Sequence, residues 1–194
     1  MGAREEILDN VRKNQPCGRD LPAVPMFHRE GRPVTETFAA ALKTMAGETI
    51  ERPPADLAEF LQRRFPAAKN ICSAVPEFPG GMKPLDFPDW ASPAAIDVTV
   101  VRSPLGVAET GSVLLSEKEL GVNTIAFLAH DIVVLLDPKR IVENIHDAYA
   151  HPAFRDSNYA VLLTGPSGTA DVGGIVVHPA QAVTTMTVIF WPES

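Results

Sequence analysis

The sequence contains very little cysteine, and this scarcity excludes several kinds of site. Only two of its 194 residues are cysteines, Cys17 and Cys72, and no C-x-x-C pair occurs. A disulfide framework, an iron–sulfur cluster and a cysteine-rich zinc site all need more thiols or a closer spacing. We therefore expect two reduced thiols, and no metal or other cofactor bound to this chain.

The sequence also lacks an excess of positive charge and lacks long hydrophobic runs. Seventeen Lys and Arg residues stand against twenty-four Asp and Glu residues, which gives a net charge of −7. A nucleic-acid surface needs clustered cations, so we expect no nucleic-acid partner. No run approaches the length that spans a membrane, and the charged N-terminus lacks the apolar core of a signal peptide. We expect a cytoplasmic protein.

The remaining composition favours a single folded domain. Hydrophobic residues make up 45% of the chain and charged residues 21%, which is typical of a globular protein. We expect one domain over residues 1–194, with a helical N-terminal part (1–66) and a sheet core (67–194) that carries both motif loops described below.

Hydrophobic periodicity predicts alternating helices and strands. Helices are expected at residues 3–13, 36–47 with Thr35 as N-cap, 56–65 and 138–152. Strands are expected at residues 69–75, 96–103, 131–137, 159–164 and 185–191. The apolar runs 131–137 and 159–164 are expected to be neighbouring buried strands, and 185–191 an edge strand. This order predicts an α/β fold, a mostly parallel sheet flanked by helices, with ligand sites at strand ends.

The first loop that carries candidate site residues is "GVAETGS". The candidate ligand-binding residues in it are Gly106, Thr110, Gly111 and Ser112. Glu109 stands between small residues, where a carboxylate can act as a nucleophile, a base or a hydroxyl acceptor. The alternative is that Glu109 is simply a solvated charge.

The second loop is "TGPSGTAD", which follows the expected strand 159–164. The candidate ligand-binding residues in it are Thr164, Gly165, Ser167, Gly168, Thr169 and Asp171. Hydroxyl groups and free backbone N–H groups in a tight turn can bind a small anion, and a following helix would add its positive end. The alternative is a plain turn in which Asp171 caps that helix. We expect the two loops to line one cleft.

The two loops, together with "DIVVLLDPKRIVENIHDAY" between them, resemble the LUD-domain family, whose named member is lactate utilisation protein C. The likeness covers roughly the last half of the chain. It implies the α/β fold of the sugar-phosphate isomerase and CoA-transferase superfamily. It also implies a role in oxidising L-lactate to pyruvate beside iron–sulfur and Cys-rich partner subunits, with the clusters held by those partners.

The chain departs from the family pattern at two places. The family carries Arg in T-G-P-S-R-T-A-D, where this chain has Gly168, so a natural bidentate partner for a carboxylate is missing. The family also places a G-V-H-G-P run after the Asp; here Gln181 falls at the His position. His178 is either a shifted equivalent or a coincidence.

Three functions remain open at this point. The first is a lactate-utilisation-type protein that binds a small anionic ligand. The second is a stand-alone CoA-transferase or sugar-phosphate isomerase that uses Glu109, a role that rests on fold analogy. The third is a non-catalytic structural subunit.

Overall fold

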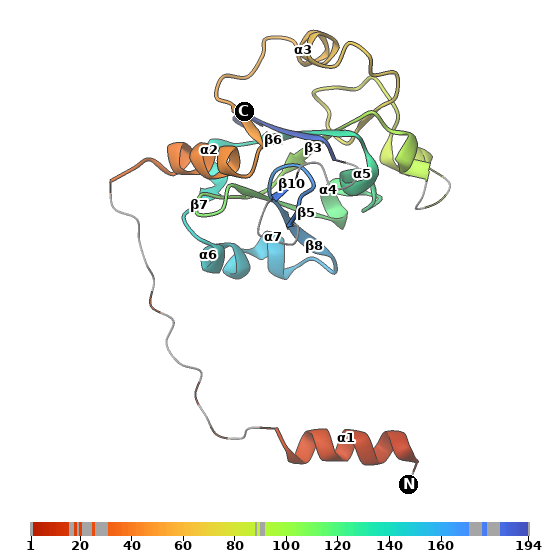
Figure 1. Cartoon of the computed structure of the whole chain (residues 1–194), viewed down its shortest axis with the longest axis vertical. Coiled ribbons are helices and arrows are strands. Elements are labelled where there is room, and N and C mark those ends of the chain that lie inside the picture. Colours follow the sequence, from red (N-terminus) through yellow and green to blue (C-terminus); the bar gives the residue numbers. More distant parts are fainter. Residues whose placement is uncertain are drawn as a thin grey trace.

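The computed structural model contains two main β-sheets that share one hydrophobic core (Figure 1). The structure describes residues 2–15, 18, 20, 25, 31–87, 89, 92–170, 176–177 and 183–193. The strands are β1 (Glu48–Ile50), β2 (Ile71–Ser73), β3 (Val98–Ser103), β4 (Gly106–Val107), β5 (Ser112–Ser116), β6 (Asp131–Leu136), β7 (Ile141–Val142), β8 (Ala160–Leu163), β9 (Thr169–Ala170), β10 (Val176–Val177) and β11 (Thr185–Phe190). The α-helices are α1 (Ala3–Lys13), α2 (Val34–Thr44), α3 (Leu57–Arg64), α4 (Glu117–Leu120), α5 (Ile125–Leu128), α6 (Ile145–Ala150) and α7 (Pro152–Arg155), and short 3-10 turns are η1 (Pro84–Asp86), η2 (Ser92–Ala95) and η3 (Pro138–Arg140).

The larger sheet is entirely parallel and has the strand order β1-β11-β6-β3-β2. The predicted α/β fold with a mostly parallel sheet is therefore confirmed. Its central strand β6 is apolar on both faces because both faces are covered. Ile132, Val134 and Leu136 belong to the main core, whereas Val133 and Leu135 pack with the apolar side of α3 on the opposite face.

Helix α3 forms the outer layer over one face of this sheet (Figure 1). Asp56, at the start of the expected helix 56–65, accepts hydrogen bonds from the backbone N–H groups of Ala58 and Glu59, at 2.7 and 3.1 Å. These bonds satisfy two of the unpaired donors at the start of the helix. Leu57 and Leu61 lie one turn apart, and both are buried against the sheet.

The second sheet, with the order β7-β4-β5-β8, covers the other face. Its strand β5 lies between β4 and β8 and is antiparallel to both. Val113 and Leu115 of β5 point into the main core, where they join Phe38 and Leu42 of α2. The opposite face of this sheet packs against α6 and α7, which therefore form the outermost layer on that side (Figure 1).

Two predicted strands lie in different places from those expected. Residues 160–163 form β8, which is at the edge of the second sheet and only half-buried, so the prediction of a fully buried neighbour of β6 was wrong. Strand β11 is not at an edge: it lies between β6 and β1. The reason is β1, whose three residues are too few for a periodic signal, and which lies in the part expected to be helical.

Two predicted helix boundaries also need correction. Residues 138–152 do not form one helix, because Ile141 and Val142 pair with β4 as strand β7, and α6 begins only after its N-cap Asn144. Helix α2 begins after Pro33 rather than after Thr35. It ends at Thr44 and is followed by Ala46, a residue with φ of +63°, after which the backbone N–H of Gly47 donates to the carbonyl of Leu42 at 3.0 Å.

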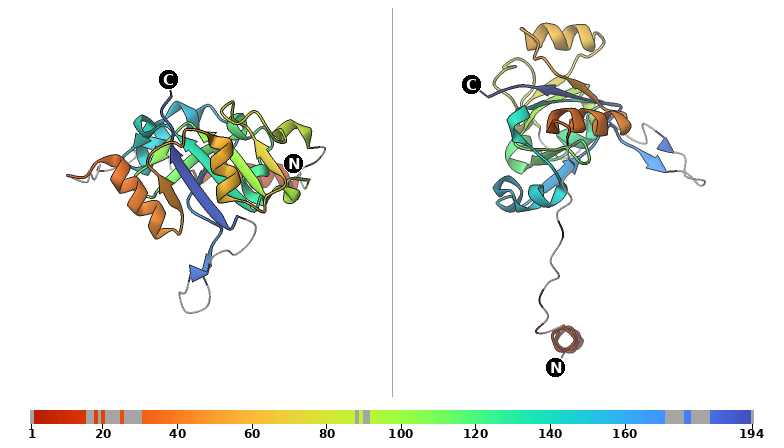
Figure 2. Two further views of the ribbon diagram at one scale, coloured as in Figure 1. Left: turned by 90° about the horizontal axis from the view of Figure 1, so that it is seen from above. Right: turned by 90° about the vertical axis from the view of Figure 1, so that its left-hand side faces the viewer.

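Helix α1 forms as predicted, and none of its residues is buried. Figures 1 and 2 show it apart from the two sheets. Within the described residues, no helix is both long enough and apolar enough to cross a membrane.

Candidate functional site

The two motif loops meet because their strands pair. Strand β5 begins at Ser112 and β8 ends at Leu163, and the antiparallel pairing places the start of the first beside the end of the second. The side-chain oxygens of Ser112 and Thr164 lie 2.5 Å apart, although 52 positions separate them in sequence. The expectation that the loops come together is therefore correct for the end of the first loop, at Ser112, and the start of the second, at Thr164.

Three hydroxyl groups form a chain at this junction. The Oγ1 atom of Thr110 lies 2.6 Å from Oγ of Ser112, which in turn contacts Thr164. Each hydroxyl carries one proton, so two bonds among three hydroxyls use two protons and leave one, on the hydroxyl that does not donate within the chain. The chain can therefore donate one hydrogen bond to a ligand and also accept bonds, and each internal bond polarises the next.

The glycines of the loops make room for helix α2. Gly111 has φ of +68°, and a Cβ atom there would lie 2.2 Å from the backbone nitrogen of Leu42. Gly165 has φ of +67°, and its Cβ atom would lie 2.1 Å from the carbonyl oxygen of Met45. Gly106 is packed against core side chains, with Leu136 only 2.8 Å from where its Cβ atom would be. These three glycines thus permit close packing, and their predicted contact with a ligand stays a prediction.

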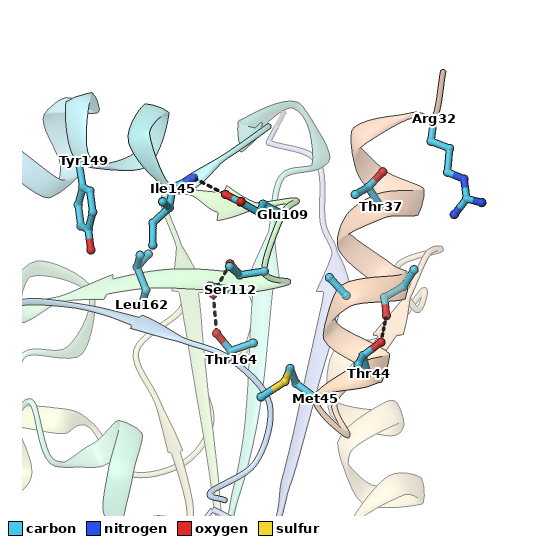
Figure 3. Close-up of a pocket in the computed structure, with 13 residues that line it drawn as sticks. Arg32, Thr37, Thr44, Met45, Glu109, Ser112, Ile145, Tyr149, Leu162 and Thr164 are labelled. Carbon is cyan, nitrogen blue, oxygen red and sulfur yellow. Dashed lines mark hydrogen bonds between the residues drawn. The ribbon is translucent and has the colours of Figure 1, made fainter. Parts of the chain in front are cut away.

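A cavity of about 960 Å³ lies between α2 and the two loops (Figure 3). One wall consists of Arg32, Thr37, Ala40, Ala41, Thr44 and Met45. The other consists of Glu109, Thr110, Ser112, Ile145, Tyr149, Leu162 and Thr164. In Figure 3 Ser112 and Thr164 lie near the centre, with Tyr149, Ile145 and Leu162 to one side and α2 to the other. Of the candidate residues in the first loop, Glu109, Thr110 and Ser112 therefore line this cavity.

Glu109 is exposed and lies at the cavity wall. Its Oε2 atom accepts a hydrogen bond from the backbone N–H of Ile145, at 3.1 Å, and its own backbone N–H donates to the carbonyl of Glu143, at 3.0 Å. The carboxylate thus satisfies a donor at the start of α6 and holds this helix against the loop. It has a structural contact, and it also remains within reach of a ligand in the cavity.

Ser167, Gly168 and Thr169 of the "TGPSGTAD" loop do not line the cavity. The backbone N–H of Ser167 donates to the carbonyl of Val183, at 2.9 Å, so it is not a free donor for an anion. Gly168 and Thr169 are exposed, and Thr169 begins β9, which pairs with β10 as a hairpin. Strand β9 thus lies within the loop itself, and the start of the helix expected after Asp171 lies outside the described residues. Both strands project from the sheets in Figure 2.

Two of the predicted residues, Asp171 and His178, lie outside the described residues. Sequence reasoning also missed several residues of the cavity. Arg32 lies just before α2 and lines the cavity from there, and Tyr149 lines it from α6. Along α2, the cavity residues are three or four positions apart, which is typical of one helix face and could have been recognised in the sequence: Thr37, Ala40, Ala41 and Thr44. Arg32 and Tyr149 had no such sign, because only the packing of α2 and α6 brings them to the loops.

Elsewhere in the described chain, no three His, Cys, Asp or Glu side chains lie close enough together to hold a metal ion. His130 contacts Asp131 at 3.0 Å and His151 accepts a bond from Ala153 at 3.2 Å, so each has a local partner.

Comparison with known proteins gives a structural match but no sequence match. No protein-family model matches the sequence, and no curated protein matches it. A solved structure of a DUF162 family protein from Deinococcus radiodurans is similar, with a TM-score of 0.64, covering 80% of this chain and 94% of that one. DUF162 is the LUD-domain (lactate utilisation) family. The two sequences are 12% identical, so the likeness shows that this chain has the fold of a DUF162 protein.

Proposed function

We propose that this chain is a lactate-utilisation-type protein that binds a small anionic 2-hydroxy acid in the cavity between α2 and the two loops. In this proposal it supports the oxidation of L-lactate to pyruvate together with iron–sulfur and Cys-rich partner subunits. The main support is the hydroxyl chain that joins the two loops inside one cavity. The fold of the DUF162 neighbour is consistent with this assignment.

The polar groups of the cavity match the two functional groups of a 2-hydroxy acid. The chain of Thr110, Ser112 and Thr164 supplies a hydroxyl donor for a carboxylate oxygen. Arg32 supplies positive charge at the cavity edge, in a chain whose net charge of −7 otherwise repels anions. Glu109 can accept a hydrogen bond from the hydroxyl group of the acid. In this proposal Arg32 supplies, from the edge of the cavity, the positive charge that the family pattern has at the position of Gly168.

Oxidation of L-lactate to pyruvate releases two electrons and two protons; the electrons need a redox acceptor, and the protons pass to water. The proposal assigns the electrons to the iron–sulfur partner subunits, because the two cysteines of this chain are fewer than the four thiolates of a typical cluster. The role of this chain is then to hold and orient the acid while a partner accepts the electrons.

Calorimetric titration with L-lactate tests the binding step. We expect a measurable heat for the wild type, and a two- to tenfold weaker affinity for Thr164→Val, since the loss of one neutral hydrogen bond costs about 0.5–1.5 kcal/mol. Thr35→Val is the matched control, because Thr35 lies on α2 but does not line the cavity. No binding of L-lactate or pyruvate to the folded wild type would refute the proposal.

Gene deletion tests the biological role. Cells that lack this chain are expected to lose growth on L-lactate and to regain it with the wild-type gene. Neighbouring genes for a ferredoxin-like protein and a Cys-rich protein would support the same role, and unimpaired growth of the deletion strain on L-lactate would contradict it.

A stand-alone CoA-transferase or sugar-phosphate isomerase is the second candidate, because the Glu109 carboxylate lies at the cavity wall. It requires turnover by the purified chain alone, with a CoA thioester or a sugar phosphate. Glu109→Gln abolishes such turnover if Glu109 is the nucleophile or base. Turnover by the wild type that is lost in this variant would favour this candidate over the first.

A further inference from the structure

We infer that the cavity selects 2-hydroxy acids whose side chain is apolar and several carbons longer than the methyl group of lactate. This inference rests on the proposed function and names the substrate class of the same site. In this arrangement the acid group binds at the hydroxyl chain, and the apolar tail lies along Leu162, Ile145 and Tyr149.

The cavity is much larger than a lactate molecule. At about 30 Å³ for each water-sized group, lactate occupies on the order of 100 Å³. The cavity measures about 960 Å³, which is within the range of about 300–1,000 Å³ that drug-sized ligands fill. Lactate alone would leave most of this space to water and would bury little apolar surface.

The large apolar side chains of the cavity lie on one side of its polar centre. Ile145, Tyr149 and Leu162 lie together on one side of Ser112 and Thr164, and all of them line the cavity (Figure 3). The tail of a bound acid therefore has one continuous apolar wall beside the polar centre. On the opposite side, the small side chains of Ala40 and Ala41 lie in the middle of the α2 wall and leave width for the tail.

Tyr149 is a half-exposed aromatic residue whose ring is held in one orientation. It is 49% exposed, although it lies on α6 next to the core of the second sheet. Its ring meets the ring of Phe154 edge to face, with 4.9 Å between centroids, and this contact orients it. An apolar tail over Tyr149 would cover this ring without any rearrangement of the helix.

The test is a calorimetric series of L-lactate, 2-hydroxybutyrate, 2-hydroxyhexanoate and hexanoate against the full chain. Each additional buried methylene is expected to increase affinity about fourfold. 2-Hydroxyhexanoate is therefore expected to bind about 60-fold more tightly than lactate. Hexanoate, which lacks the hydroxyl group, is expected to bind more weakly than 2-hydroxyhexanoate.

Tyr149→Ala removes part of the apolar wall, and we expect it to reduce the gain per methylene. Tyr159→Ala is the matched control, since Tyr159 is 37% exposed and does not line the cavity. It is expected to leave the series unchanged.

Each other outcome has a distinct meaning. If lactate binds and the longer acids bind no better, the inference is overturned while the proposed function stands. If hexanoate binds as well as its 2-hydroxy form, recognition of the hydroxyl group is refuted. If no acid of the series binds, both the inference and the proposed function are overturned.

Discussion

A single methyl group added at Gly165 tests whether α2 packs directly on the second loop. The Cβ atom of an alanine there would lie 2.1 Å from the carbonyl oxygen of Met45, and at Gly111 it would lie 2.2 Å from the backbone nitrogen of Leu42. Both contacts are with backbone atoms, which cannot rotate away as the end of a side chain can. Either α2 or the loop must therefore move.

The expected loss of stability has two parts. A non-glycine residue in the left-handed region costs about 1–2 kcal/mol. Forcing a methyl group into a packed site costs about 1–3 kcal/mol more. The free energy of unfolding of Gly165→Ala is therefore expected to fall by about 2–5 kcal/mol, a large share of the 5–15 kcal/mol typical of a domain. Equilibrium unfolding in urea, followed by far-UV circular dichroism, measures this change.

Gly121→Ala separates the two parts. Gly121 has φ of +65° and ψ of −56°, a conformation that alanine rarely adopts, but the nearest atom to its Cβ position is a side-chain atom, Cβ of Pro84 at 3.2 Å. We therefore expect this variant to lose mainly the backbone part, about 1–3 kcal/mol. Equal losses in Gly121→Ala and Gly165→Ala would refute the packing of α2 on the loop, because the added contact with α2 would then cost nothing.

Three further predictions concern single residues. Ala46→Gly is expected to raise the free energy of unfolding by about 0.5–1 kcal/mol, because φ at Ala46 is +63°, and urea unfolding that shows no gain would contradict it. Burial raises the pKa of Cys72 to about 11, so in a Cys17→Ser variant iodoacetamide at pH 8 is expected to label the native protein far more slowly than the urea-unfolded one. Hydrogen bonding from the Lys139 backbone N–H lowers the pKa of Asp137 below its ordinary 3.8. Its contribution to stability is thus complete above about pH 4 and is lost as the pH falls through the lowered pKa, so the wild type's advantage over Asp137→Asn is expected to shrink in acid unfolding experiments.

The sequence determined the elements whose signals are local. The apolar run at 131–137 predicted a central strand, because every side chain of such a strand must be buried on one face or the other. The spacing of Leu57, Phe60 and Leu61 predicted helix α3, because this pattern repeats within a single helical turn. The small polar residues around Ser112 and Thr164 indicated two loops that belong together.

What those loops contact depends on packing between distant segments of the chain. Strand β1 has three residues and carries no periodic signal, yet its pairing moves β11 away from the sheet edge. The positive φ angles of Gly111 and Gly165 fitted either a ligand or a neighbouring element, and the position of α2 shows that they admit a helix backbone. Arg32 and Tyr149 reach the cavity through the packing of α2 and α6, which are far apart in sequence. Long-range packing of this kind depends on which surfaces fit together, and no local pattern of residues encodes that fit.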